Sequence, residues 1–256
     1  MREDRPSAPI LGSDATGPDA FARSPASAAI LLDVDGTISP IVATPDRAAL
    51  VGGAEEVLVR LAGRYRVVAA ISGRTQDELD RIVHVPGVRR MGMYGLETGP
   101  VSNEVVIAVR AVAGDVPGAW VEPKGATIAV HYRKVLDADA AALALRSRLR
   151  VVAEHAGLEL APGKRVVELV PAGRPLKAAA VDRILTDPEL RAALYAGDDV
   201  ADIEAFSALD RATADGRLDG AVKVAVRGAE TPQELLDAAD VVVDGPAGMV
   251  GLLRTL

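Results

Sequence analysis

The chain has 256 residues, which is long enough for one large domain or for a domain that carries a smaller insert. Its 29 basic residues against 36 acidic ones give a net charge of -7, which disfavours binding to nucleic acid or to an anionic membrane surface. The sequence has no cysteine, which excludes disulfides, thiolate metal sites and cysteine nucleophiles and favours a cytoplasmic location.

The first 26 residues predict a disordered leader. Pro, Gly and Asp interrupt this segment, and it lacks the apolar centre of a signal peptide. No apolar run elsewhere approaches the roughly 20 residues that a membrane-spanning helix needs. We therefore expect a protein without a membrane partner.

Strand and helix signals alternate after the leader. Residues 28–32 form a continuous apolar run, which is typical of a strand buried on both faces of a sheet. A helix is predicted over 46–64, a second buried strand over 66–71 and another helix over 75–83. Strand, helix and strand in this order predict a right-handed parallel crossover.

The same alternation returns near the end of the chain. The pattern predicts helices over 177–185, 200–209 and 232–238, a short last helix to residue 256, and strands over 194–196, 222–226 and 241–243. The fold class expected from both ends of the chain is α/β, with a doubly wound parallel sheet.

The middle of the chain, residues 101–171, has a different pattern. Short strand signals at 127–132 and 165–170 surround one alanine-rich helix over 137–155. This predicts a small α+β domain inserted into the parallel core. The expected division is a leader over 1–26, a core over 27–100 and 172–256, and the insert over 101–171.

Two carboxylates stand at the end of the first buried strand, in the sequence Asp33-Val34-Asp35-Gly36-Thr37. Gly36 allows a sharp turn there. Carboxylate oxygens without nearby His or Cys suit Mg²⁺, which also takes phosphate oxygens from a substrate. The ordinary alternative is a pair of acids in a solvated turn.

Further polar residues follow the other predicted strands. Ser72 and Gly73 come after one strand, and Asp198 and Asp199 come after another, with Asp202 one helical turn further on. In doubly wound sheets, ligands bind at the carboxyl ends of the strands. Lys177 opens a helix, where a cation gains nothing from the helix dipole and a phosphate would explain its position.

These motifs, in this order, resemble the four motifs of the haloacid dehalogenase superfamily. Within it, the chain is similar to trehalose-6-phosphate phosphatases from about residue 28 to its end. The similarity rests on residues 32–40, on Tyr94-Gly95-Leu96-Glu97 and on Gly197-Asp198-Asp199 with Asp202 and Phe206. Residues of the insert resemble that family's sugar-binding cap: Glu122-Pro123-Lys124, His131-Tyr132-Arg133, and Gly163-Lys164 with Glu168.

The resemblance implies a mechanism and a set of roles. Asp33 would attack phosphorus to form an aspartyl phosphate, and Asp35 would act as acid and then base. Mg²⁺ would be held by Asp33, the backbone carbonyl of Asp35, and Asp198, with Asp199 and Asp202 supporting these ligands. Ser72, Gly73 and Lys177 would bind the phosphoryl group. The sugar would contact Glu97, Glu122, Lys124, Arg133, Lys164 and Glu168.

The sequence departs from the family pattern around the helix lysine, which stands in Arg174-Pro175-Leu176-Lys177-Ala178 without the usual Asn and Gly. Ala201 and Ile203 also replace the usual Thr and acidic residue. The resemblance implies hydrolysis of trehalose 6-phosphate. Separately from the resemblance, we expect a monomer. The alternatives are a phosphatase for sucrose phosphate, mannosylphosphoglycerate or a trehalose-like pseudo-disaccharide phosphate, or a non-catalytic phosphoacceptor or sugar-phosphate sensor. His131 has two interpretations, a sugar contact or a packed cap residue.

Overall fold

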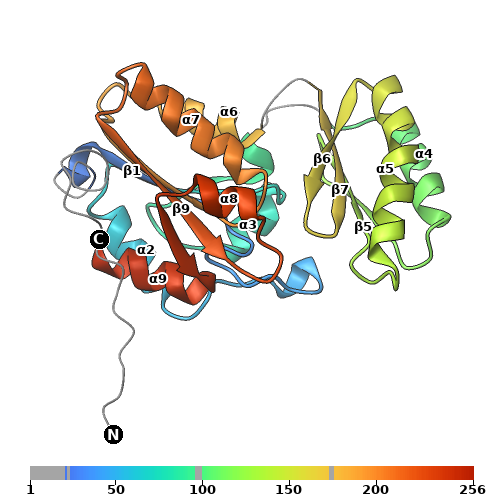
Figure 1. Ribbon diagram of the computed structural model, residues 1–256, viewed down its shortest axis with the longest axis horizontal. Helices are drawn as coiled ribbons and strands as arrows, with labels where there is room; N and C mark the ends of the chain where they lie inside the picture. Colours follow the sequence, from blue (N-terminus) through green and yellow to red (C-terminus); the bar gives the residue numbers. More distant parts are fainter. Residues whose placement is uncertain (1–20, 22–23, 96–99, 173–175) are drawn as a thin grey trace, which may run out of the picture.

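The computed structural model describes residue 21 and residues 24–95, 100–172 and 176–256. These residues form two lobes, which lie side by side in Figure 1. One lobe contains a six-stranded sheet in the order β10-β9-β8-β1-β2-β3, and the other contains a four-stranded sheet in the order β4-β5-β7-β6. We call them the core lobe and the cap lobe.

Every strand pair of the core lobe is parallel. The central strand β1 is buried throughout because it has a strand on each side and helices above and below. This confirms the predicted doubly wound sheet. The strands are β1 (Ala28–Leu32), β2 (Val67–Ile71), β3 (Arg89–Met91), β8 (Ala192–Gly197), β9 (Gly220–Arg227) and β10 (Val241–Asp244).

Helices cover both faces of this sheet. Alternate residues of β1 point to opposite faces, so Ile30 and Leu32 belong to one apolar cluster and Leu31 to the other. The first cluster includes residues of α2 (Ala54–Ala62), α3 (Gln76–Ile82) and α9 (Gly245–Thr255). The second includes residues of α6 (Leu176–Ile184), α7 (Asp202–Ala214) and α8 (Gln233–Ala238).

The cap lobe is an antiparallel sheet with helices on one face. Its strands are β4 (Trp120–Pro123), β5 (Ile128–His131), β6 (Leu158–Gly163) and β7 (Val166–Pro171), and its helices are α4 (Asn103–Gly114) and α5 (Ala138–His155). The prediction of one helix here is wrong. The hydroxyl oxygen of Ser102 accepts from the N–H of Val105, and Val109 and Ala113, four residues apart, bury one face of α4.

The helix predicted over 46–64 is also too long. Gly53 has φ +81, a left-handed conformation that stops the helical pattern, so α2 begins only at Ala54. The segment before it contains a short 3₁₀ helix, η2 (Pro45–Arg47). Two further 3₁₀ helices are η1 (Pro25–Ser27) and η3 (Gly92–Gly95).

Part of the predicted leader packs on the core. Phe21 is fully buried, and its ring stacks on that of Tyr65 with centroids 5.2 Å apart. Residues 1–20, 22 and 23 lie outside the described residues. Among the helices that are described, none is long and apolar enough to cross a membrane.

Candidate active site

The carboxyl ends of neighbouring strands bring the predicted polar residues together. Asp33 follows β1, Ser72 follows β2 and Asp198 follows β8, and β1 lies between the other two strands. The backbone N–H of Asp33 continues the ladder to the carbonyl of Ala196 at 2.9 Å. The three residues therefore meet at the edge where ligands bind in sheets of this type.

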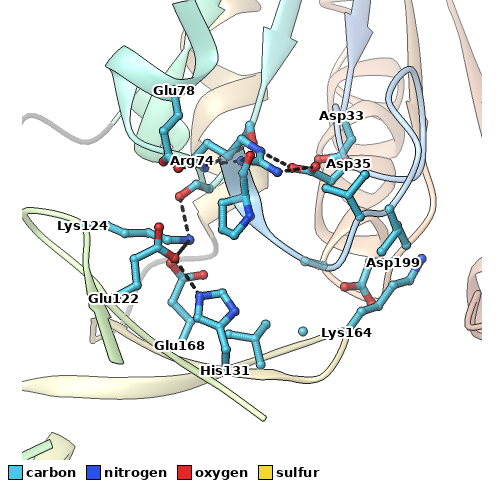
Figure 2. Close-up of a pocket in the computed structure, with 18 of the residues that line it drawn as sticks. Asp33, Asp35, Arg74, Glu78, Glu122, Lys124, His131, Lys164, Glu168 and Asp199 are labelled. Carbon is cyan, nitrogen blue, oxygen red and sulfur yellow. Dashed lines mark hydrogen bonds and ion pairs between the residues drawn. The ribbon is translucent and has the colours of Figure 1, made fainter. Parts of the chain in front are cut away.

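A cavity of about 210 Å³ lies at this edge, between the two lobes. Core residues line one side and cap residues the other (Figure 2). Predicted site residues in its lining are Asp33, Asp35, Ser72, Gly73, Glu122, Lys124, Arg133, Lys164, Glu168, Lys177, Asp198 and Asp199.

A buried lysine links two of the acids. The Nζ of Lys177 donates to Oδ1 of Asp33 at 2.9 Å and to Oδ1 of Asp202 at 2.5 Å. All three side chains are at least nine-tenths buried. Burial alone would lower the pKa of Lys177, but the charges of Asp202 and Asp33 raise it well above its ordinary value. The lysine thus stays charged in the cavity floor, close to Asp33.

The carboxylates of Asp33, Asp198 and Asp202 offer oxygens that all lie within 4.8 Å of one another. Asp202, however, already uses both oxygens. One accepts from Lys177 and from the hydroxyl of Tyr195 at 2.7 Å, and the other accepts from the N–H groups of Asp198 and Asp199, both at 2.9 Å. Asp202 therefore fixes the turn after β8, and Asp33 and Asp198 are the better cation ligands.

The electrostatics of these two acids fit a cation site. Burial raises the pKa of Asp33 well above its ordinary value, and the charges of Asp202 and Asp198 act in the same direction. Burial likewise raises the pKa of Asp198 to about 7. Two desolvated carboxylates this close need a positive partner to remain ionised. A hard divalent cation that takes oxygen ligands suits this donor set.

Glycines at two positions allow the acids to approach. Gly36 has φ +89, and a Cβ at this position would collide with the carboxylate of Asp198. A Cβ on Gly197 would collide with the carboxylate of Asp202 in the same way. Glycine is therefore needed at Gly36 and Gly197 because a side chain would not fit, and Gly36 also needs it for its left-handed backbone.

Asp35 points toward Arg74 rather than toward Asp33. The Nε and Nη2 of Arg74 donate to the two oxygens of Asp35 at 2.7 and 2.8 Å, a bidentate pair that is drawn in Figure 2. Arg74 also donates to the carbonyl of Pro45 at 3.1 Å. Arg74 was not predicted as a site residue, although its place next to Ser72 and Gly73 could have indicated it.

One face of the cap sheet supplies charged side chains to the cavity. Alternation along the strands puts Glu122, His131 and Glu168 on the face opposite α4 and α5, whose apolar contacts come from the intervening residues. His131 Nε2 lies 2.7 Å from Oε2 of Glu122, and Lys124 Nζ lies 3.7 Å from Oε1 of Glu168. The ring of His131 stacks on Trp120 with centroids 4.5 Å apart.

Lys164 and Arg133 reach the core lobe. The Nζ of Lys164 donates to Oδ2 of Asp198, so this cap residue enters the acidic cluster. Arg133 donates to the carbonyl of Lys164 at 2.8 Å and lies 3.6 Å from a carboxylate oxygen of Glu230. Arg133 also lines the cavity.

Of the predicted sugar contacts, Glu97 lies outside the described residues. Tyr94, before it, lines the cavity and was not predicted as a site residue. Burial, together with the charge of Glu168, raises the pKa of Tyr94 well above its ordinary value, so this hydroxyl stays protonated. Met93 and Tyr94 have φ of 52° and 55°, a left-handed pair that no sequence pattern indicates.

Comparisons with known proteins identify a family and two kinds of similar protein. A family model described as trehalose-phosphatase matches residues 31–239. An uncharacterised glycosyl hydrolase of Mycobacterium tuberculosis is 36% identical over 204 residues, which are 71% of this chain and 15% of that protein. The trehalose-phosphate phosphatase of Mycobacterium avium is 32% identical over 202 residues, which are 71% of this chain and 51% of that enzyme.

A solved structure shows the same fold. The C-terminal domain of trehalose-6-phosphate phosphatase from C. albicans superposes with a TM-score of 0.77 at 20% identity, covering 93% of this chain and 94% of that one. The chain spans about half the length of the Mycobacterium avium relative, 51%, and less of the glycosyl hydrolase. Because the family model covers well over half of the sequence, the chain belongs to the trehalose-phosphatase family.

Proposed function

We propose that this chain is a magnesium-dependent phosphatase that hydrolyses trehalose 6-phosphate to trehalose and phosphate in trehalose biosynthesis. The observation that carries the proposal is the buried pair of Asp33 and Lys177 at the floor of a cavity whose opposite wall is the charged face of the cap sheet. The names of the Mycobacterium avium relative and its family support the choice of substrate.

Asp33 is the nucleophile in this proposal. A carboxylate oxygen of Asp33 forms a bond to phosphorus while the bond from phosphorus to the sugar oxygen breaks, which leaves an aspartyl phosphate and the free sugar. Water then forms a bond to the same phosphorus, and the Asp33 carboxylate leaves. Lys177 lies 2.9 Å from Oδ1 of Asp33 and supplies a fixed positive charge for the phosphoryl oxygens.

Asp35 is the general acid and then the general base in this proposal. It gives a proton to the departing sugar oxygen and later takes one from the attacking water. Both of its oxygens accept from Arg74 in the structure, so this role requires Asp35 to leave the bidentate pair and turn toward the sugar oxygen. The hydroxyl of Ser72 and the backbone of Gly73, which also line the cavity, bind the remaining phosphoryl oxygens.

Mg²⁺ would be held by the carboxylates of Asp33 and Asp198 and by the backbone carbonyl of Asp35. It would supply positive charge that offsets the repulsion between a carboxylate and a phosphate. Asp202 supports these ligands through the backbone of Asp198 and Asp199. Asp199 lies beside the site in the cavity wall.

The cap lobe selects the sugar. We propose that residues 101–171 form this cap and that residues 27–100 and 172–256 form the catalytic core. Glu122, Lys124 and Glu168 present charged groups to sugar hydroxyls, and binding of the whole disaccharide sets the specificity. Arg133, Lys164 and Glu97 complete the proposed sugar contacts. A cytoplasmic monomer remains our prediction.

The test is phosphate release from trehalose 6-phosphate, measured beside the phosphates of sucrose, mannosylglycerate and glucose, with Mg²⁺ or with a chelator. The proposal expects a magnesium-dependent preference for trehalose 6-phosphate that is lost in Asp33→Asn. Equal rates on every ester would remove trehalose 6-phosphate as the substrate and keep a phosphatase. No release from any ester would favour a phosphoacceptor or sugar-phosphate sensor.

A further inference from the structure

Among the described residues, no apolar cluster joins the two lobes. Two hydrophobic clusters of the described residues lie in the core lobe and one lies in the cap lobe, and none contains residues of both. The lobes are drawn as separate bodies in Figure 1. Residues of both lobes line the cavity described above. Since burial of apolar surface is the main force that fixes packed elements, the position of the cap must depend on polar contacts.

Several of these contacts come from one hairpin of the cap. β6 and β7 pair up to Gly163 and Val166, so Lys164 and Arg165 form a two-residue turn. Arg165 has φ +60, which is unfavourable for a residue with a side chain. The turn sends Lys164 to Asp198 in the catalytic cluster and Arg165 to a different part of the core.

The core residue that Arg165 contacts is Glu230, which lies in the loop between β9 and α8. Its carboxylate lies 3.6 Å from Nη1 of Arg133 and 3.7 Å from Nε of Arg165. Arg133 in turn donates to the backbone carbonyl of Lys164 at 2.8 Å. One core carboxylate therefore contacts the hairpin directly through Arg165 and indirectly through Arg133.

The loop that carries Glu230 is held in place. The N–H of Gly228 donates to the hydroxyl of Thr231 at 2.8 Å, and that hydroxyl donates to the carbonyl of Val226 at 3.1 Å, at the end of β9. β9 is paired with β8, which ends at the catalytic Asp198. The loop on which Glu230 stands is thus tied to the strand next to the one that precedes Asp198.

We propose that Glu230 is a positioning residue that holds the cap lobe against the core lobe through Arg133 and Arg165, and so keeps Lys164 in the catalytic cavity. Glu230 does not touch the substrate. The side chains of Arg133, Arg165 and Glu230 are 28%, 43% and 36% exposed, so water and salt weaken both ion pairs. The latch therefore holds the cap closed weakly enough for it to open and admit a ligand.

The first test measures the distance between the lobes without any ligand. Because the chain has no cysteine, Val59→Cys in α2 and Leu143→Cys in α5, both at exposed positions, give two specific sites for nitroxide labels. Double electron–electron resonance then reports the distribution of core-to-cap distances. Glu230→Gln should increase the population of longer distances roughly threefold or more, as two lost surface ion pairs predict.

Two controls make the result specific. Glu234→Gln removes the same charge from an exposed residue four positions further on, and its distances should match those of the parent protein. High salt should shift the parent protein toward the Glu230→Gln distribution and have little further effect on that variant. A Glu230→Gln distribution that equals those of the parent and of Glu234→Gln would overturn the proposal.

The second test is kinetic and rests on the proposed function. Glu230→Gln should raise KM for trehalose 6-phosphate about threefold to tenfold with kcat within about twofold, because a displaced Lys164 affects binding before chemistry. An unchanged KM together with longer distances would overturn the link to Lys164. If the ester is not a substrate at all, the distance measurement still decides whether Glu230 is a latch.

Discussion

The two lobes differ in how helices cover their sheets, and this difference decides where polar side chains stand on the strands. In the core lobe, helices cover both faces of the sheet, so β1 is apolar throughout and its first polar neighbour, Asp33, follows its end. In the cap lobe, helices cover one face, so each strand alternates and its other face carries Glu122, His131 and Glu168. In the proposed function, chemistry therefore lies at strand ends in the core, and recognition lies along strands in the cap.

The strongest test of this comparison is Asp33→Asn. The amide has the shape of the carboxylate but cannot act as the nucleophile, so phosphate release should fall roughly a thousandfold or more. Thermal unfolding should show that the variant is folded, because burial of a neutral amide costs less free energy than burial of a carboxylate. Activity within about tenfold of the parent would move the nucleophile elsewhere.

Lys177→Met should cause the largest loss of stability. It leaves Asp33 and Asp202 buried without their shared cation, which should cost about 3 kcal/mol or more in the free energy of unfolding. Urea titration measures this value. Lys223→Met is the matched control, because its ion pair with Asp210 is partly exposed and should contribute less than about 1 kcal/mol. Equal losses would contradict the assigned roles.

Lys124→Ala should separate recognition from chemistry. The Nζ of Lys124 lies 3.7 Å from Glu168 and 3.8 Å from Glu122, so its removal changes the charged cap face. We expect KM for trehalose 6-phosphate to rise about tenfold, with kcat for p-nitrophenyl phosphate within about twofold. Steady-state kinetics on both esters gives the comparison. A similar loss on both would place Lys124 in the chemical step.

The smallest expected effect is the response of stability to pH and Mg²⁺. Burial raises the pKa of Asp198 from 3.8 to about 7, so the folded protein without a cation binds a proton that the unfolded chain does not. This stability is fully present below pH 3.8 and is lost as the pH rises through about 7. Raising the pH from about 5.5 to about 8 should therefore lower Tm by a few degrees.

Mg²⁺ should counter this decrease, because a cation stabilises the ionised carboxylate. Its addition should raise Tm more at the higher pH than at the lower one. Asp198→Asn should show a smaller dependence on pH and on Mg²⁺. Differential scanning calorimetry measures all of these values. An identical pH profile in Asp198→Asn would show that other groups cause the dependence.

Much of the core site could be predicted from the sequence because its positions follow from one local rule. A continuous apolar run implies a strand buried on both faces, and the polar residues after three such runs, Asp33, Ser72 and Asp198, must then meet at one edge. The strand β3 was missed because its sequence, Arg89–Met91, has two charged residues and no apolar run.

Contacts between residues far apart in the chain could not be predicted from the sequence. The ion pair of Arg133 with Glu230 joins the two lobes, and the bidentate pair of Arg74 with Asp35 lies within the core lobe; both join residues far apart in the chain. Neither partner lies in a periodic pattern that would reveal the other. The polar face of the cap sheet was not predicted either, because 127–132 and 165–170 were recognised only as short strands, and the face appears once the pairing of the strands is known.

The central claim is that Asp33 carries the phosphoryl group during turnover. The direct test is mass spectrometry of the protein after rapid acid quenching of a reaction with trehalose 6-phosphate and Mg²⁺, with borohydride reduction to mark the acyl phosphate. Our account predicts a single labelled site at Asp33, absent from Asp33→Asn. A label at another residue, or steady turnover with no label at Asp33 at any quench time, would contradict it.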